Sequence, residues 1–461
     1  MDDKGEGLEA KSNMSAEDSA NSSDVLYGET ESIASKSSPI FKLNVDCFEE
    51  LFEWLSFSDL LAFRLVCKRF KQIIDYHIKT EFPRKLLGSA KSLAKNGPYY
   101  FEKLDTSNYP HLVTRLAIQR SLCRNFYSND AYRTLTRGRR YLSQIESLEI
   151  TLRIHQYDHS LQVVHEFLSK WCTNLEFLTI KWCNYGDELL RYPYTKLKYL
   201  HVEDLNCFNM DPSSIPIYYF RLGNFFKQNA SIQLFSTDSR SFLSLNGIFL
   251  DTTIRFKILS LMRVCDSEDT ARLCDFINKL YEQGFYKRLK LELTRQKIET
   301  VNLIASLPGL TTLYLKQKIA TLPQILGLKE LYVDYAESHD LQTLAKNQVN
   351  VERVCLFDAS SNEVLTFIRD APNVKEIRVR TLRSGIHFKN DVINLSAFDR
   401  ERKFSANAHP ITLYLPEKVV LATKWAMNTT KMGSITLKRG SAMRSLYKED
   451  YEFRQYSEYK W

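Results

Sequence analysis

The sequence lacks the features of several common protein classes. None of its nine cysteines forms a C-x-x-C pair, and glycine and proline are few, at 15 and 12 of 461 residues, which excludes disulfide miniproteins and collagen-like chains. No apolar run approaches the roughly 18 residues that a membrane span requires, and no apolar segment follows a basic start as in a secretion signal. We therefore expect a soluble globular protein with free thiols, in the cytosol or the nucleus.

Motifs that carry catalysis are also missing. There is no G-x-x-x-x-G-K, no G-x-G-x-x-G between a strand and a helix, no G-x-S-x-G and no H-E-x-x-H. His155, His159 and His165 lie close together in the sequence, but a metal needs three convergent ligands with supporting partners, and His165 belongs to an apolar helical pattern. We predict a protein without catalytic residues, metal or cofactor.

Charge is unevenly distributed but selects no partner. Residues 1–38 carry a net charge of −6 with few apolar side chains, which predicts a disordered acidic tail, and the rest of the chain carries +14. No polybasic block concentrates that positive charge, so we expect neither a membrane nor a nucleic acid as partner. A short cluster comprising Arg133, Arg137, Arg139 and Arg140 is interpreted as a solvated surface.

Three short blocks of apolar residues at helical spacing follow, between residues 39 and 83. Ser56 and the pair Ser58–Asp59 stand where one helix should end and the next should begin. These blocks predict a compact helical module of about 40 residues, which is too small to build a large core of its own.

The stretch LNVDCFEELFEWLSFSDL at residues 43–60, followed by LVCKRF at residues 65–70, resembles an F-box. An F-box lays its first helices against the Skp-family adaptor of a cullin ubiquitin ligase, so the resemblance implies these two partners and no catalysis by this chain. The positions that it assigns to adaptor binding are Leu43, Phe48, Leu51, Phe52, Leu55, Leu60, Val66, Cys67 and Phe70.

Such a docking module should carry more apolar residues than it can bury alone. Phe48, Leu51, Phe52, Trp54 and Leu55 exceed one face of a small helix, as expected of a helix that docks into a partner's groove. The alternative is that these side chains pack on the rest of the chain.

From residue 145 the chain repeats a pattern of one apolar, two variable, one apolar, one variable and one apolar residue. The better copies recur every 18 to 23 residues, which is the period of leucine-rich repeats. The copies are Ile145/Leu148/Ile150, Leu175/Leu178/Ile180, Leu197/Leu200/Val202, Phe256/Leu259/Leu261, Leu310/Leu313/Leu315, Leu328/Leu331/Val333, Val351/Val354/Leu356 and Val374/Ile377/Val379, with weaker ones at Ile232/Leu234, Leu289/Leu291/Leu293, Ile411/Leu413/Leu415 and Ile435/Leu437.

The predicted fold is α/β, with the small helical F-box module followed by an irregular leucine-rich-repeat solenoid of ten to twelve units. Its strands form a parallel sheet on the concave side, and returning helices, predicted near residues 161–168, 273–280 and 364–368, lie outside. An antiparallel or doubly wound sheet is the alternative, but Asn-Gly hairpin turns are nearly absent. The expected segments are a disordered tail at 1–38, the F-box at 39–83, a connector at 84–144 that packs it on the repeats, the solenoid at 145–440, and an aromatic cap or tail at 441–461.

Variable residues between the apolar positions should face the concave side in rows. One expected row is Thr179, His201, Tyr314, Tyr332, Cys355 and Arg378, and the next is Lys181, Glu203, Lys316, Asp334, Phe357 and Arg380. Because Tyr and Arg are enriched in binding hot spots, the candidate target-binding residues are Tyr314, Tyr332, Phe357, Arg378 and Arg380.

The resemblance implies the substrate receptor of an SCF-type ubiquitin ligase, which binds an unknown target protein for ubiquitination and proteasomal degradation. No homo-oligomer is required. One alternative is a leucine-rich-repeat scaffold outside any ligase. Another is a nucleic-acid binder that uses the arginine cluster together with Arg378 and Arg380.

Overall fold

The computed structural model divides the chain into two compact units, residues 1–77 and 78–461. We call them unit 1 and unit 2 and consider each by itself. The structure describes residues 39–43, 45–52, 54–55, 57–81, 115–120, 143, 147–152, 170–181, 189–203, 215–250, 254–264, 269–294, 298–316, 322–334, 338–383, 392–404 and 409–439. The predicted tails at 1–38 and 441–461, most of the connector, the arginine cluster and the three close histidines lie outside these residues.

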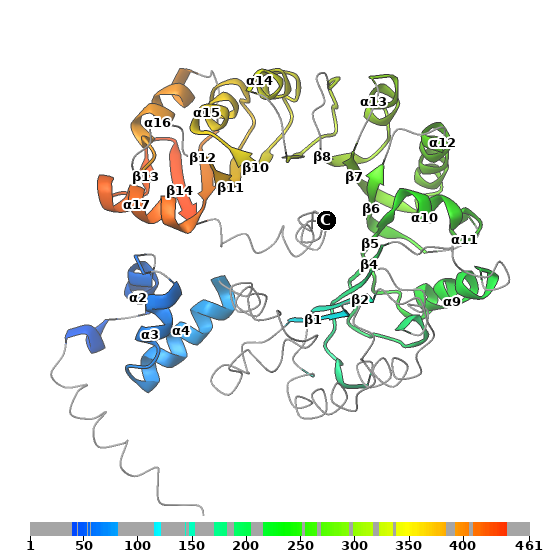
Figure 1. Cartoon of the computed structure of the whole chain (residues 1–461), viewed down its shortest axis with the longest axis horizontal. Helices are drawn as coiled ribbons and strands as arrows, with labels where there is room; N and C mark the ends of the chain where they lie inside the picture. The colour runs from blue at the N-terminus through cyan, green and yellow to red at the C-terminus, as the bar shows by residue number, and fades with distance from the viewer. Residues whose placement is uncertain are drawn as a thin grey trace, which may run out of the picture. The chain divides into compact units, whose positions relative to one another are not determined.

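Unit 1 is the expected helical module. After a 3-10 turn at Pro39–Lys42 come helices α2 (Val45–Phe52), α3 (Phe57–Phe63) and α4, which spans Lys68–Glu81 (Figure 1). Asp59 lies in the first turn of α3, where the positive end of the helix dipole favours an acidic side chain. The three helices match the three apolar blocks of the sequence.

Unit 2 is built on one open sheet of 14 strands. The strands follow one another in chain order and pair in parallel, apart from the short strand β13, which is antiparallel to β14 at the last edge. The strands are β1 (Arg115–Arg120), β2 (Ser147–Leu152), β3 (Phe177–Lys181), β4 (Tyr199–Glu203), β5 (Leu234–Asp238), β6 (Phe256–Val264), β7 (Tyr286–Leu293), β8 (Leu310–Leu315), β9 (Glu330–Val333), β10 (Arg353–Ala359), β11 (Glu376–Leu382), β12 (Ile411–Leu415), β13 (Lys431–Met432) and β14 (Ile435–Arg439).

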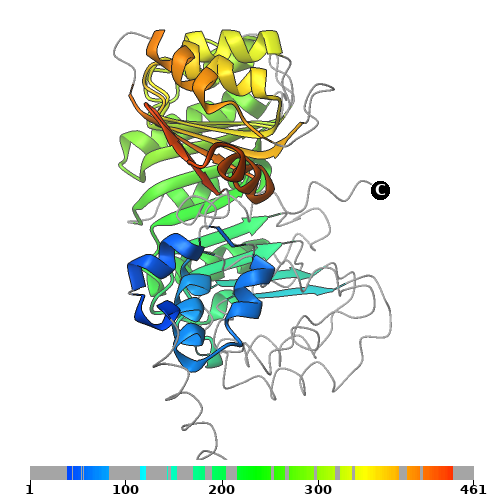
Figure 2. The ribbon, with the colours of Figure 1, turned by 90° about the vertical axis from the view of Figure 1, so that its left-hand side faces the viewer.

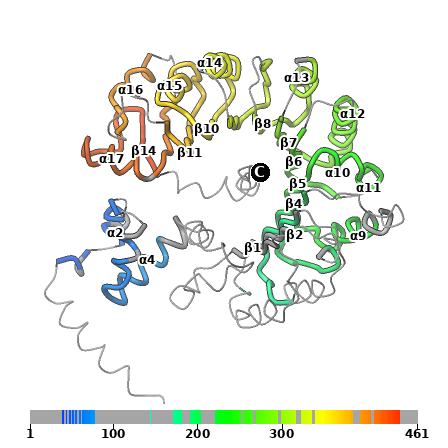
Figure 3. The backbone as a smooth tube through the Cα atoms, viewed as in Figure 1, coloured from blue at the N-terminus to red at the C-terminus, as the bar shows by residue number. Residues whose placement is uncertain are grey.

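Helices cover one face of this sheet, as Figures 1 and 2 show. The tube in Figure 3 returns through these helices from the end of one strand to the start of the next, as parallel pairing requires. The helical segments are η5 (Leu189–Arg191), α9 (Ile215–Gln228), α10 (Ser239–Ser244), α11 (Asn246–Leu250), α12 (Asp269–Glu282), α13 (Ile298–Ala305), α14 (Ser338–Asn347), α15 (Ser361–Asp370), α16 (Leu395–Phe404) and α17 (Glu417–Met427).

The core lies between the sheet and these helices. In strand β8, for example, Leu313 and Leu315 belong to a continuous buried cluster that also contains Phe276 and Ile277 of helix α12. Tyr314, between the two leucines, belongs to a separate buried cluster, because successive strand residues point to opposite faces. We call the face that carries Tyr314 the open face of the sheet.

The residue just before a repeat's first apolar position contacts the preceding repeat in three neighbouring copies. Asn350 and Asn373 each donate a side-chain hydrogen bond to a backbone carbonyl 24 residues earlier, at 3.0 and 2.9 Å. At the equivalent position before strand β9 stands Gly327, where a Cβ atom would lie 2.9 Å from the carbonyl oxygen of Leu310. In these copies this residue therefore limits how closely neighbouring repeats approach.

The repeated apolar pattern of the sequence predicted most strands of the sheet. All twelve apolar copies lie at or next to a strand, and the returning helices near 273–280 and 364–368 are α12 and α15, whereas 161–168 lies outside the described residues. One difference is strand β1, which falls in the segment assigned to the connector and pairs in parallel with β2. The sheet therefore begins at least one strand before residue 145.

Candidate functional site

The aromatic residues of unit 1 pack against each other. Phe48, Phe52 and Phe70 are no more than 1% exposed. The ring of Phe48 lies 5.9 Å from that of Phe52 and 5.1 Å from that of Phe70, and Phe63 stacks on Phe70 at 4.5 Å. Leu60 is buried with them. These rings form the internal core of the module.

This packing corrects one sequence-based expectation. Phe48 and Phe52 are not surplus apolar surface, because α2 places them four residues apart on the face that α4 covers through Phe70. Leu51, Trp54 and Leu55 are only partly buried, so the expected surplus exists but is smaller. A partner that approaches unit 1 meets these residues rather than the two buried rings.

Among the described residues of unit 1, the most exposed aliphatic side chains lie in the turn between α3 and α4. Leu65 is 74% exposed and Val66 is 58% exposed. Val45, at the start of α2, is 48% exposed. Exposed aliphatic side chains clustered in one short turn provide the apolar surface that a docking partner would cover.

Polar contacts connect this turn to helix α4. Cys67 precedes α4 and caps it, since its Sγ accepts from the backbone N–H of Phe70 at 3.5 Å. Arg64, 4% exposed, forms an ion pair with Asp75 of α4, and its Nη2 donates to Asp75 Oδ2 at 3.1 Å. Residues on both sides of Leu65 and Val66 are therefore fixed to α4.

The nine predicted adaptor-binding residues thus divide into two groups. Phe48, Phe52, Leu60 and Phe70 form the core that shapes the module. Leu43, Leu51, Leu55 and Cys67 are half-buried, and Val66 is exposed.

On the open face of unit 2 the side chains form rows across the strands, but their register differs from the expected one. His201 aligns with Ser236, Ser236 with Ser260, Ser260 with Lys290, and Lys290 with Thr312, not with Tyr314. The reason is an offset of two residues between strands β7 and β8, because Lys290 pairs with Thr312 and Tyr314 pairs with Glu292. A bulge in β8, where Leu289 pairs with Leu310 but Lys290 pairs with Thr312, lies at this offset. Thr179 and His201 therefore do not share a row with Tyr314.

Two complete rows cross strands β8 to β12. The first row consists of Thr312, Glu330, Arg353, Glu376 and Thr412, and the second row consists of Tyr314, Tyr332, Cys355, Arg378 and Tyr414.

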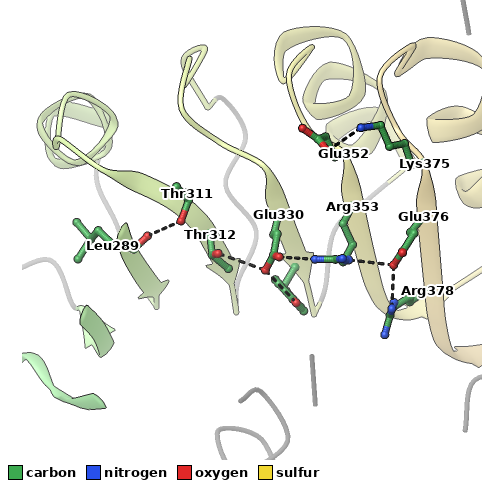
Figure 4. A network of polar contacts seen from close by, with 10 residues as sticks. Leu289, Thr311, Thr312, Glu330, Glu352, Arg353, Lys375, Glu376 and Arg378 are labelled. Atoms are coloured by element: carbon green, nitrogen blue, oxygen red, sulfur yellow. Dashed lines mark hydrogen bonds and ion pairs between the residues drawn. The ribbon is translucent and has the colours of Figure 1, made fainter. Parts of the chain in front are cut away.

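The first row is a network of charges, drawn in Figure 4. Arg353 Nε donates to Glu376 Oε2 at 3.0 Å, and Arg353 Nη1 donates to Glu330. Glu376 Oε2 also accepts from Arg378 Nη2 at 2.8 Å. Burial alone would raise the pKa of Glu376, but the hydrogen bonds from Arg378 and Arg353 outweigh it and the pKa is lowered. The network therefore stays ionised near neutral pH.

The sequence-based selection missed this network. It considered only the variable positions just before and just after the third apolar residue of each repeat. Glu330, Arg353 and Glu376 occupy the position just before the second apolar residue, where the sign of the charge alternates in three successive repeats. That alternation was the available signal, because in-register strands bring such residues side by side.

The second row contains three of the five candidate target-binding residues. Tyr314 and Tyr332 stack with ring centroids 4.2 Å apart and are 1% and 2% exposed. Arg378 is 4% exposed, and its guanidinium lies over the ring of Tyr414 at 4.5 Å. The structure brings these residues together as expected but leaves them little accessible surface.

The other two candidates lie beside this row. The guanidinium of Arg380 lies over the ring of Phe357 at 4.3 Å, and both residues are half-buried. They are the accessible members of the predicted set.

A further charge ladder crosses the start of the same strands. Glu352 accepts from Lys375 Nζ at 2.9 Å and pairs with Lys329 Nζ at 2.9 Å. The hydrogen bonds from Lys375 and Lys329 lower the pKa of Glu352 to about 2.

In the part of the chain that the structure describes, no three His, Cys, Asp or Glu side chains gather as a metal would need. Within the same residues, no helix combines the length and apolar character needed to cross a bilayer.

Comparison with known protein families identifies an F-box domain at residues 40–82. The match coincides with the helices of unit 1 and with the range expected from the sequence. No curated protein matches the chain. The chain therefore carries an F-box domain. Because F-box domains bind Skp-family adaptors within cullin-based ligases, the chain has the features of an SCF-type substrate adaptor.

Proposed function

We propose that this protein is the non-catalytic substrate receptor of an SCF-type ubiquitin ligase. Unit 1 binds the Skp-family adaptor and, through it, the cullin, while unit 2 holds a target protein for ubiquitination and degradation. The observation that carries the proposal is the F-box match at residues 40–82 together with the exposed turn at Leu65 and Val66. Catalysis then consists of proximity, which the receptor supplies to a ubiquitin-charged enzyme.

We assign the repeats of unit 2 to the leucine-rich type. The support is the repeated apolar pattern, the parallel sheet with one strand per copy, and the asparagines that donate hydrogen bonds to the preceding repeat. In such a stack the open face presents its side chains in rows, which suits it to protein binding.

The adaptor contact is tested by a pull-down of the purified full chain with the Skp-family adaptor. Changing Leu65→Asp and Val66→Asp together places two charges on the exposed turn and leaves the buried rings of Phe48 and Phe52 in place. We expect adaptor capture to fall at least tenfold, as removal of central apolar contacts does at other interfaces.

The matched control is Leu326→Asp, which introduces the same charge at a residue of unit 2 that is 74% exposed. This control should capture the adaptor like the unchanged protein. Failure of the unchanged chain to capture the adaptor would reject the proposal, and so would full capture by the Leu65/Val66 variant. A complex that contains the adaptor but never a cullin would instead favour a repeat scaffold outside a ligase.

A further inference from the structure

An arginine on the open face of unit 2 is buried with most of its hydrogen-bonding capacity unused. Arg378 is 4% exposed, and only its Nη2 donates, to Glu376 at 2.8 Å. Its Nε and Nη1 atoms are buried and find no acceptor among the residues that the structure describes. Since a guanidinium carries five N–H groups, at least three of them are left for another partner.

The neighbours of Arg378 hold its side chain in place without using these groups. The ring of Tyr414, the next residue of the second row, stacks on the guanidinium at 4.5 Å. A ring on the face of a guanidinium leaves its N–H groups free, because they point outward in the plane. On the other side in the row stands Cys355, which bears no charge in its thiol form.

Buried N–H groups of a charged side chain are costly to leave unpaired, and natural proteins seldom do so. An arginine fixed in this way is suited to receive an oxyanion, since charge-assisted hydrogen bonds are the strongest that a guanidinium forms. Phe357 and Arg380 lie two residues after Cys355 and Arg378 on strands β10 and β11, on the same face of the sheet, and both are half-buried.

The burial of Arg378 selects the kind of oxyanion. Glu376 already accepts from Nη2, so any anion that binds Arg378 lies near a second negative charge. Both the attraction to Arg378 and the repulsion from Glu376 double for a doubly charged phosphate, but the cost of removing water from an ion rises with the square of its charge, so a position this buried favours a singly charged carboxylate.

We propose that Arg378 is the anchor of a carboxylate-binding subsite that receives an Asp or Glu side chain of the bound target protein. Arg380 and Phe357 form the adjoining contact surface. This inference rests on the proposed function, because it assumes that the open face holds the target. It adds the class of target segment, namely an acidic peptide.

The test uses the purified full chain on an array of 15-residue peptides. Each peptide contains one central Asp or Glu and is matched by peptides with Asn, Gln or phosphoserine at that position. We expect preferential binding of Asp or Glu peptides over their amide partners. Arg378→Gln should weaken that preference about tenfold or more, since it removes a charged donor.

Two further variants separate a binding role from a structural one. Arg369→Gln removes an exposed arginine on helix α15 and should leave the preference unchanged. Arg378→Lys keeps the charge but not the planar fork, so it should retain part of the preference for acidic peptides. Thermal unfolding of each variant confirms that it is folded before the array is read.

Equal binding of acidic and amide peptides by the unchanged protein would overturn the proposal. The proposal would also be overturned if the folded Arg378→Gln variant kept the same preference for acidic peptides as the unchanged protein. If phosphoserine peptides bound more strongly than Asp or Glu peptides, the choice of a carboxylate would be overturned. The adaptor pull-down is independent of these peptide-array results. An intact acidic preference without adaptor capture would reject the receptor role and keep the subsite, whereas the reverse result would reject the subsite alone.

Discussion

A buried arginine in helix α16 provides the sharpest test of how unit 2 is held together. Arg402 is 1% exposed, and its guanidinium donates five hydrogen bonds of 2.8 to 3.0 Å to backbone carbonyls. The acceptors include Ile368 and Ala371 at the end of helix α15, where the last carbonyls have no partner within the helix. Burial lowers the pKa of Arg402 to about 10, so the side chain is still charged at pH 7.

The change Arg402→Met keeps an unbranched apolar stem and removes all five bonds. At about 1.5 to 3 kcal/mol each, five bonds from a charged donor would sum to about 7 to 15 kcal/mol. The guanidinium must be stripped of water to make them, however, and removing one partner of a buried charged network costs about 3 to 5 kcal/mol in practice. We therefore expect the free energy of unfolding to fall by about 3 to 5 kcal/mol.

Urea denaturation of the full chain, followed by far-ultraviolet circular dichroism, measures this change. The matched control is Arg400→Met, an exposed arginine on the same helix, which should change stability by no more than about 0.5 kcal/mol. Arg402→Lys should lie between them, because an ammonium has three donors and no fork. Equal midpoints for the Arg402→Met and Arg400→Met variants would refute the reasoning.

Three other predictions follow from burial and charge. Phe48→Ala should destabilise helices α2 to α4 by about 3 to 5 kcal/mol, whereas Leu65→Ala should destabilise them by no more than about 0.5 kcal/mol. Hydrogen exchange in these helices measures both effects. Equal effects of the two variants would contradict the assigned core. Because the folded-state pKa of Glu352 lies below its unfolded value of 4.5, its contribution is complete above that pH and is lost as the pH falls toward about 2. Acid titration of Glu352→Gln should therefore show a shallower loss of stability in this window, by at most about 1 kcal/mol because solvent screens the pair, and an unchanged slope would argue against the two lysine contacts. Gly327→Ala should lower the free energy of unfolding of unit 2 by about 1 to 3 kcal/mol, because the new Cβ clashes with the Leu310 carbonyl of the preceding repeat. Gly247→Ala has open space around the new Cβ and should not lower the urea midpoint.

The strands of unit 2 could be predicted because each one buries a short alternating apolar segment, and that alternation is written in the sequence. The register between strands could not be predicted in full. It depends on irregular pairing on both sides of β7: one residue of β6 is skipped between Leu261 and Val264, and one residue of β8 is skipped between Leu310 and Thr312. Nothing in the pattern of leucines distinguishes these bulges from ordinary repeats.

The helices of unit 1 were likewise predictable, but their orientation was not. Helical spacing places Phe48 and Phe52 on one face of α2, yet it does not say whether α4 or a partner covers that face. The resemblance to an F-box favoured the partner, and the packing of Phe70 shows that α4 does so. Arg402 was not predicted for a related reason, since it lies in the charged stretch Asp399–Lys403, which reads as a solvated surface.

Hydrogen–deuterium exchange of the full chain, with and without the Skp-family adaptor, tests the central claim most directly. The account predicts slower exchange in residues 39–81 on adaptor binding, strongest in the turn from Leu65 to Cys67, and no change in strands β8 to β12. Protection of those strands with none in the turn would contradict it.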